Sequence, residues 1–138
     1  MQIDIKGRNV PVTDEIRTHA ERRLNKVARL RLGNDEPFAM ETCYFSAEEY
    51  PDLTRTSLGR GSLFSILERD HEIQLAYADE EVDATAADST TAHLLEVPRG
   101  HPLLRMRQVI YSTKGKATVY VLGLYRSDRY NLLIRRFR

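Results

Sequence analysis

The feature that most constrains the fold of this 138-residue chain is a hairpin pattern towards its C-terminal end. Residues 103–112 and 118–126 are both rich in β-branched and other apolar side chains, and Lys114-Gly115-Lys116 lies between them. A short turn containing glycine between two such runs is typical of a β-hairpin. We therefore expect a pair of antiparallel strands here.

A second hairpin is predicted earlier in the chain. Residues 29–32 alternate arginine with leucine, Gly33-Asn34-Asp35 is a strong turn signal, and residues 37–46 continue as a strand. Alternation of apolar and polar residues also predicts strands over residues 73–87 and 131–137.

The N-terminal part predicts a strand followed by a helix. Residues 2–6 alternate as a half-buried strand does, and Thr13 is a plausible N-cap for a helix that ends near Ala28. Apolar residues then recur on one stripe at helical spacing. They are Ile16, Ala20, Leu24 and Val27.

Two short helices are predicted further along. Ser62 can cap one that runs through Leu67, and Asp88 or Ser89 can cap another that ends at Leu95. Strands outnumber helices and hairpins connect many of them. The fold class is therefore α+β, an antiparallel sheet with helices packed on it.

Composition places the chain among globular proteins. It is 41% hydrophobic and 30% charged, and no linker rich in Pro, Gly or Ser divides it, so residues 1–138 are expected to form one domain. No apolar run approaches the 18 or so residues that a membrane span requires, and the start has no signal-peptide core. Cys43 is the only cysteine, which excludes a disulfide within the chain and fits a cytoplasmic protein.

Charge is distributed unevenly along the chain. Residues 1–31 contain eight Lys/Arg and four Asp/Glu, whereas residues 32–138 contain thirteen and sixteen. A basic segment of this kind fits either a nucleic-acid-binding portion or an ordinary solvated helix face, and the second is the commoner reason.

The sequence holds no convergent set of catalytic groups. It lacks a phosphate-binding glycine loop and a nucleophile elbow, and its four histidines have no metal-ligand spacing with one another or with Cys43. Cys43 is expected to be a small buried residue. Asp79-Glu80-Glu81 is expected to be a solvated edge or loop. We therefore expect no enzyme activity, no metal and no cofactor.

Two features could bind an anion. Arg29 and Arg31 point to the same face of a strand, because side chains alternate with a period of two, and a pair of guanidinium groups can bind a phosphate or carboxylate. Gly61-Ser62-Leu63-Phe64 opens a predicted helix, where free backbone N–H groups attract anions. Each signal is weak alone, and together they predict a site for a phosphorylated or acidic small molecule.

Four ordered segments resemble a known family. They are Arg29–Leu32 with Glu36–Phe45, Gly61–Glu68, Leu94–Leu104 and Tyr125–Tyr130. Residues 29–138 resemble, through these segments, the UTRA domain of the HutC subfamily of GntR transcription regulators. The resemblance implies a UTRA and chorismate-lyase-like α+β fold.

The resemblance also implies a function. In that family the domain binds a small effector, often a phosphosugar or a carboxylate, and mediates homodimerisation. Carried over by position, the residues expected to bind the ligand are Arg29, Arg31, Glu41, Ser62, Phe64 and Tyr125. Val119 stands where several sugar-phosphate-sensing members have a glutamate.

Residues 1–28 resemble a different family. Met1–Val10, Val12–Arg17 and Glu21–Val27 are similar to the opening strand and helix of ribosome hibernation promoting factors. Only this first β-α unit of that family is present, which predicts an engineered chimera in which one opening unit was exchanged for another.

Three interpretations follow. The first is an effector-sensing and dimerisation domain without its DNA-binding domain, so that this chain does not bind DNA. The second is a ribosome-binding or RNA-binding protein that uses the basic N-terminal helix, although the remaining strands and the basic helix of the hibernation-factor domain are missing. The third is an engineered scaffold that folds without binding a ligand.

Overall fold

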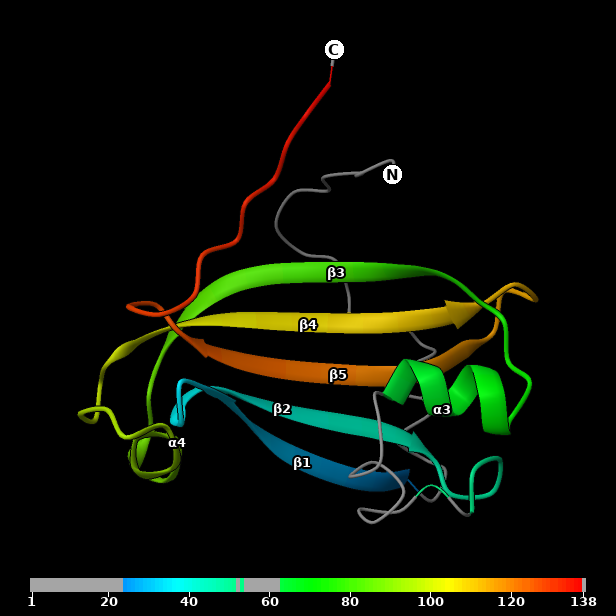
Figure 1. Ribbon diagram of the computed structural model, residues 1–138, viewed down its shortest axis with the longest axis horizontal. Coiled ribbons are helices and arrows are strands. Elements are labelled where there is room, and N and C mark those ends of the chain that lie inside the picture. The colour runs from blue at the N-terminus through cyan, green and yellow to red at the C-terminus, as the bar shows by residue number, and fades with distance from the viewer. Residues whose placement is uncertain (1–23, 52, 54–62, 138) are drawn as a thin grey trace.

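A computed structural model describes residues 24–51, 53 and 63–137 of the chain. Its elements are β1 Leu24–Gly33, β2 Glu36–Ser46, α3 Leu63–Asp70, β3 Leu75–Ala86, α4 Ser89–Leu95, β4 Pro102–Ser112 and β5 Ala117–Arg126. The strands form one antiparallel sheet in the order β1-β2-β5-β4-β3, as Figure 1 shows. The predicted α+β class, an antiparallel sheet with helices packed on it, is confirmed.

Both predicted hairpins are present. Asn34 and Asp35 join β1 to β2 with φ angles of 50° and 63°, the left-handed conformation that a tight turn between twisted strands requires. Gly115 lies in the turn between β4 and β5 with a φ of 72°. Glycine adopts this positive φ without strain because it has no Cβ atom. Local sequence therefore determines both turns.

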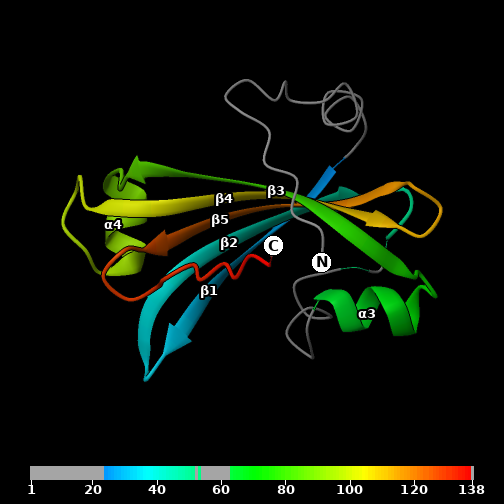
Figure 2. The ribbon, with the colours of Figure 1, turned by 90° about the horizontal axis from the view of Figure 1, so that it is seen from above.

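The two helices pack on opposite faces of the sheet and near its opposite ends (Figures 1 and 2). Cys43 of β2 faces α3, and Met40 of the same strand faces α4, because alternate residues of a strand point to opposite faces. The core under α3 contains Val27, Cys43, Phe45, Tyr50, Leu53, Leu63, Ile66, Leu67, Ile110 and Val119. The smaller core under α4 contains Ala87, Ala92, Leu95 and Leu103.

Asp88 is the residue that caps α4. Its side chain accepts a hydrogen bond from the backbone N–H of Thr91 at 2.7 Å. This bond also lowers the pKa of the Asp88 carboxyl below its usual value. Of the two caps that the sequence allowed, the structure selects Asp88.

Two predicted elements are wrong where the structure describes them. The helix expected to end near Ala28 cannot include residues 24–28, because β1 begins at Leu24 and pairs with β2 as far as Ser46. Long-range pairing outweighs the local helical pattern here. The strand expected over residues 131–137 is extended chain with no strand partner among the described residues, and Figure 1 shows it running away from the sheet.

Other expectations lie outside the part of the chain that the structure describes. They concern the half-buried strand over residues 2–6, the burial of Ile16, Ala20 and Leu24, and the capping roles of Thr13 and Ser62. Val27, from the same predicted helix, is buried, and Lys26 is exposed as expected. None of the described helices is long and apolar enough to cross a bilayer.

Candidate functional site

A cavity of about 340 Å³ lies on the face of the sheet that α3 covers. Strand residues and the start of α3 line it. They are Arg29, Arg31, Glu41, Cys43, Glu80, Met106, Gln108, Val121, Gly123 and Tyr125, together with Leu63 and Phe64. Five of the six residues predicted to bind a ligand therefore surround one cavity. The sixth, Ser62, lies outside the described residues.

Strand register explains how distant segments meet here. Glu41 pairs with Arg29 on one side and with Gly123 on the other, so all three lie in one row across the sheet. The neighbouring row on the same face joins Cys43 to Val121 and continues to β4 and β3. Antiparallel pairing brings every side chain of these rows to the same face.

Glu41 is the centre of the polar contacts in the cavity. Its side chain is only 10% exposed, and it receives contacts from Arg29 Nη2 at 3.4 Å and Arg31 Nη1 at 3.3 Å. Tyr125 donates its hydroxyl to Glu41 Oε1 at 2.6 Å. Two guanidinium groups therefore share one carboxylate, which leaves one positive charge uncompensated within this group.

Tyr125 is held as a hydrogen-bond donor. Burial raises the pKa of its hydroxyl above the usual value, and the hydrogen bond to the Glu41 carboxylate raises it further. The tyrosine ring lies across Gly123, where a Cβ atom would be far inside van der Waals contact with the ring. The glycine thus makes room for the ring to reach Glu41.

The two arginines in the cavity have hydrogen-bond donors that are available to a ligand. Arg29 Nε is buried and has no acceptor within the described part of the chain, and the Arg31 side chain is 52% exposed. Phe64, on the first turn of α3, is 45% exposed beside the cavity. An anion arriving there would find donors from one strand and an aromatic ring from the helix.

Cys43 forms part of the cavity floor. It is 1% exposed, and burial raises the pKa of its thiol. A buried thiol with a raised pKa stays protonated at neutral pH and is a poor nucleophile. The prediction of a small buried residue is confirmed.

Seven of the twelve lining residues are not among those that the sequence predicted to bind a ligand, namely Cys43, Leu63, Glu80, Met106, Gln108, Val121 and Gly123. Asp79-Glu80-Glu81 was expected to be a solvated edge or loop, and these three residues do lie exposed on the edge strand β3. Alternation within β3 and β4 divides their residues between two faces. It does not tell which face meets the arginines, because that depends on pairing between strands.

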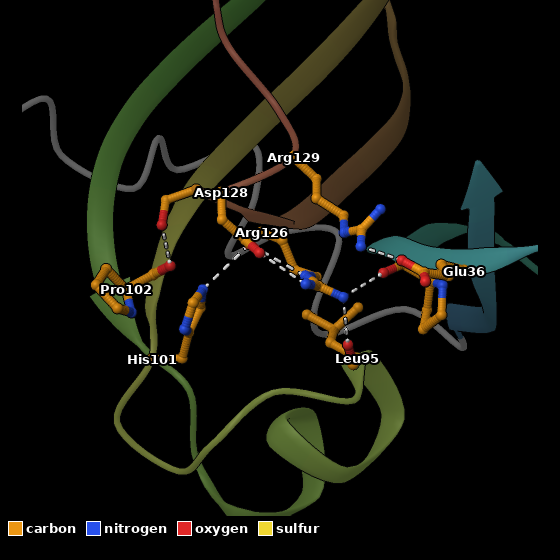
Figure 3. Close-up of polar contacts among 9 residues, drawn as sticks. Glu36, Leu95, His101, Pro102, Arg126, Asp128 and Arg129 are labelled. Atoms are coloured by element: carbon orange, nitrogen blue, oxygen red, sulfur yellow. Dashed lines mark hydrogen bonds and ion pairs between the residues drawn. The ribbon is translucent and has the colours of Figure 1, made fainter. Parts of the chain in front are cut away.

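Residues 125–130 tie this site to the rest of the molecule through a polar cluster shown in Figure 3. The buried Arg126 donates to both carboxylate oxygens of Asp128, at 3.1 and 2.7 Å, and to the backbone oxygens of Pro37 and Leu95 at 3.2 and 3.3 Å. His101 Nε2 lies 3.3 Å from Asp128 Oδ1. One side chain therefore joins β2, the end of α4 and the end of β5, next to Tyr125.

Comparison with known proteins gives a consistent result. The UTRA domain family model matches residues 5–131. The HTH-type transcriptional repressor NagR of Bacillus subtilis is 29% identical over 110 residues, which are 80% of this chain and 45% of NagR. The chain thus spans less than half the length of the curated relatives it matches.

Solved structures agree in fold. A putative transcriptional regulator from Streptomyces coelicolor is 30% identical with a TM-score of 0.74, covering 91% of this chain and 88% of that one. The ligand-binding domain of a putative GntR-family regulator from Bordetella bronchiseptica is 24% identical with a TM-score of 0.76, covering 90% and 83%.

The family match extends over most of the chain, including most of residues 1–28. The relatives are transcription regulators, and the fold is that of their ligand-binding domains. The chain therefore belongs to the UTRA domain family, the ligand-binding domain of GntR-family transcription regulators.

Proposed function

We propose that this chain senses a small anionic effector, such as a phosphosugar or a carboxylate, for a GntR-type transcription regulator. The observation that carries the proposal is the pair of arginines that share Glu41 inside a cavity of about 340 Å³. Ligand cavities in proteins commonly measure about 300–1,000 Å³, so this one suits a small metabolite.

The proposed anion contacts follow from the charges at the site. Arg29 and Arg31 have contacts of 3.3–3.4 Å to Glu41, longer than the 2.7–2.9 Å or so that is typical of strong N–H to carboxylate bonds. An anionic group can therefore take up the spare donors without displacing Glu41 from Tyr125. The effector-binding role of Glu41, Phe64 and Tyr125 belongs to the same proposal, as does that of Ser62.

Calorimetric titration with inorganic phosphate, phosphosugars and small carboxylates tests the proposal. Arg31→Ala should weaken anion binding by about tenfold or more, because a hydrogen bond to a charged group contributes roughly 1.5–3 kcal/mol. Arg99→Ala is the matched control, since Arg99 is exposed and away from the cavity. Equal binding by the two variants would refute the site. Binding of none of these anions by the unaltered protein would favour a scaffold without ligand activity.

We propose further that the domain forms a homodimer. β3 is an edge strand, and Val82 on it is 38% exposed. The extended residues 131–137 present apolar side chains to solvent, with Leu133 88% and Phe137 87% exposed. An exposed edge and an exposed apolar arm both favour pairing with another chain. We expect DNA contact to reside outside the described residues, and the regulator to act in the cytoplasm.

Two alternatives from the sequence stay hypotheses. The first is that the N-terminal β-α unit was exchanged, and the second is that the chain binds the ribosome. Both depend on residues 1–28, and the structure does not describe residues 1–23. The family match begins at residue 5, as it would for a domain whose opening unit had not been exchanged. Co-sedimentation with small ribosomal subunits would support the second alternative, and no co-sedimentation is expected if the chain is an effector domain.

A further inference from the structure

The end of the cavity opposite the arginines carries a carboxylate and an amide. Glu80 of β3 and Gln108 of β4 are paired across the two strands, and both line the cavity. Within the described residues neither side chain has a hydrogen bond or ion pair. On the other face of β3, by contrast, Glu81 contacts Arg107 at 3.1 Å and Asp83 contacts Arg105 at 2.5 Å.

Glu80 therefore differs from Glu81 and Asp83 in having no cationic partner in the part of the chain that the structure describes. Burial of part of the side chain raises the pKa of its carboxyl above the usual value, and no cation among the described residues offsets that effect. An acidic group left without a partner at the rim of a cavity is poised to receive a cation from a ligand.

The two charged ends are separated by neutral side chains. From β1 to β3 the sheet crosses four strand spacings of about 4.8 Å, and the row of Glu80 is two residues along the strands from that of Arg29. The two backbones therefore lie roughly 20 Å apart. Both side chains reach inward over that span. Between them the floor is formed by Cys43, Val121 and Met106, which offer no charge.

We propose that the effector is a small zwitterion, whose anionic group binds to Arg29 and Arg31 and whose cationic group binds to Glu80 and Gln108. The inference rests on the proposed function, because it adds a second contact to the same cavity. With Glu41 and Glu80 ionised, the two carboxylates balance the two arginines. A ligand that carries one charge of each sign matches this arrangement, whereas a simple anion leaves Glu80 unpaired.

Matched ligands that differ only in an amino group test the proposal. Calorimetry compares the affinity of 5-aminopentanoate with that of pentanoate, and the affinity of phosphoethanolamine with that of ethyl phosphate. Inorganic phosphate measures binding to the two arginines alone. In the unaltered protein the amino compound of each pair should bind about tenfold more tightly, the lower end of the range for a charged hydrogen bond. Circular dichroism and thermal unfolding show whether each variant retains the fold.

Variants of β3 separate the two ends of the cavity. Glu80→Gln should remove the preference for the amino compound without weakening the binding of pentanoate, ethyl phosphate or phosphate, because the substitution takes a negative charge out of the cavity. Asp79→Asn, the matched control, should keep the preference, because Asp79 precedes Glu80 on the same strand and points to the opposite face. Arg31→Ala should weaken the binding of every compound.

The outcomes distinguish the two proposals. Equal binding within each pair, or a preference that survives Glu80→Gln, overturns the zwitterion and leaves the anionic effector standing if Arg31→Ala still weakens binding. If neither the paired compounds nor phosphate binds to the unaltered protein, both proposals fail.

Discussion

At the scale of single residues, Glu41 organises the cavity. A carboxylate that is 10% exposed is stable only with donors around it, and Arg29, Arg31 and Tyr125 supply them. Tyr125 reaches Glu41 because Gly123 leaves space for its ring. The geometry of the site thus depends on Gly123, which has no side chain, as well as on the charged residues.

The Tyr125 hydroxyl should contribute measurably to stability. Tyr125→Phe removes the 2.6 Å hydrogen bond to Glu41, and the free energy of unfolding should fall by about 1–2 kcal/mol, since hydrogen bonds to charged groups contribute about 1.5–3 kcal/mol and this one is partly exposed. Urea unfolding measures the change. Tyr130→Phe is the control. The ring centroids of Tyr130 and Tyr125 are 4.4 Å apart, and the Tyr130 hydroxyl has no hydrogen bond within the described residues.

Gly123 should be coupled energetically to Tyr125. Gly123→Ala forces the tyrosine ring away from β5, so it should destabilise the unaltered protein and weaken anion binding. In a Tyr125→Ala background the added methyl group meets no ring, and the same substitution should be neutral or stabilising. A double-mutant cycle by urea unfolding measures this. Equal effects in both backgrounds would contradict the steric explanation.

At the scale of elements, residues 125–130 connect three parts of the fold. Arg126 joins Asp128 to the backbone of β2 and of α4, and Arg129 forms an ion pair with Glu36 at the start of β2. The Arg126 guanidinium holds the pKa of the Asp128 carboxyl well below its usual value. This cluster fixes the end of β5 next to the cavity.

Ionised Asp128 should therefore stabilise the fold in a pH-dependent way. Its folded-state pKa is lower than the ordinary value of 3.8, so the contribution is fully present above that pH and is lost as the pH falls towards the folded-state pKa. Asp128→Asn should be less stable than the unaltered protein at pH 7, and the difference should shrink below about pH 4. Urea unfolding between pH 7 and pH 2 measures this. A difference that stays constant with pH would argue against the ion pair.

At the scale of the whole molecule, the described residues form a sheet with two edge strands and an extended apolar arm. β1 and β3 form the edges, and residues 131–137 extend beyond β3 in Figure 1. The arm contains Arg135 and Arg136, whereas β3 contains Asp79, Glu80 and Glu81. Opposite charge and apolar exposure together favour an arm-to-edge contact between two copies.

Light scattering should give about twice the 15.9 kDa mass of one chain at tens of micromolar. Leu133→Ser should weaken the dimer, because Leu133 is 88% exposed on the arm. Leu94→Ser is the matched control, since Leu94 is an exposed leucine on α4. A single-chain mass for the unaltered protein would refute dimerisation, and equal masses for the two variants would exclude the arm as the contact.

Features that depend only on neighbouring residues could be predicted from the sequence. The turns at Asn34-Asp35 and Gly115 and the short helix before Leu95 follow from local chemistry, as do the two arginines on one face. Tertiary structure decided the rest. Pairing with β2 made a strand of residues 24–28, whereas residues 131–137 have no partner strand among the described residues and form no strand themselves. Glu80 lies in the cavity because of the order and register of the five strands. The alternation of residues along a strand divides them between two faces, but it does not identify the neighbouring strand or the residues opposite.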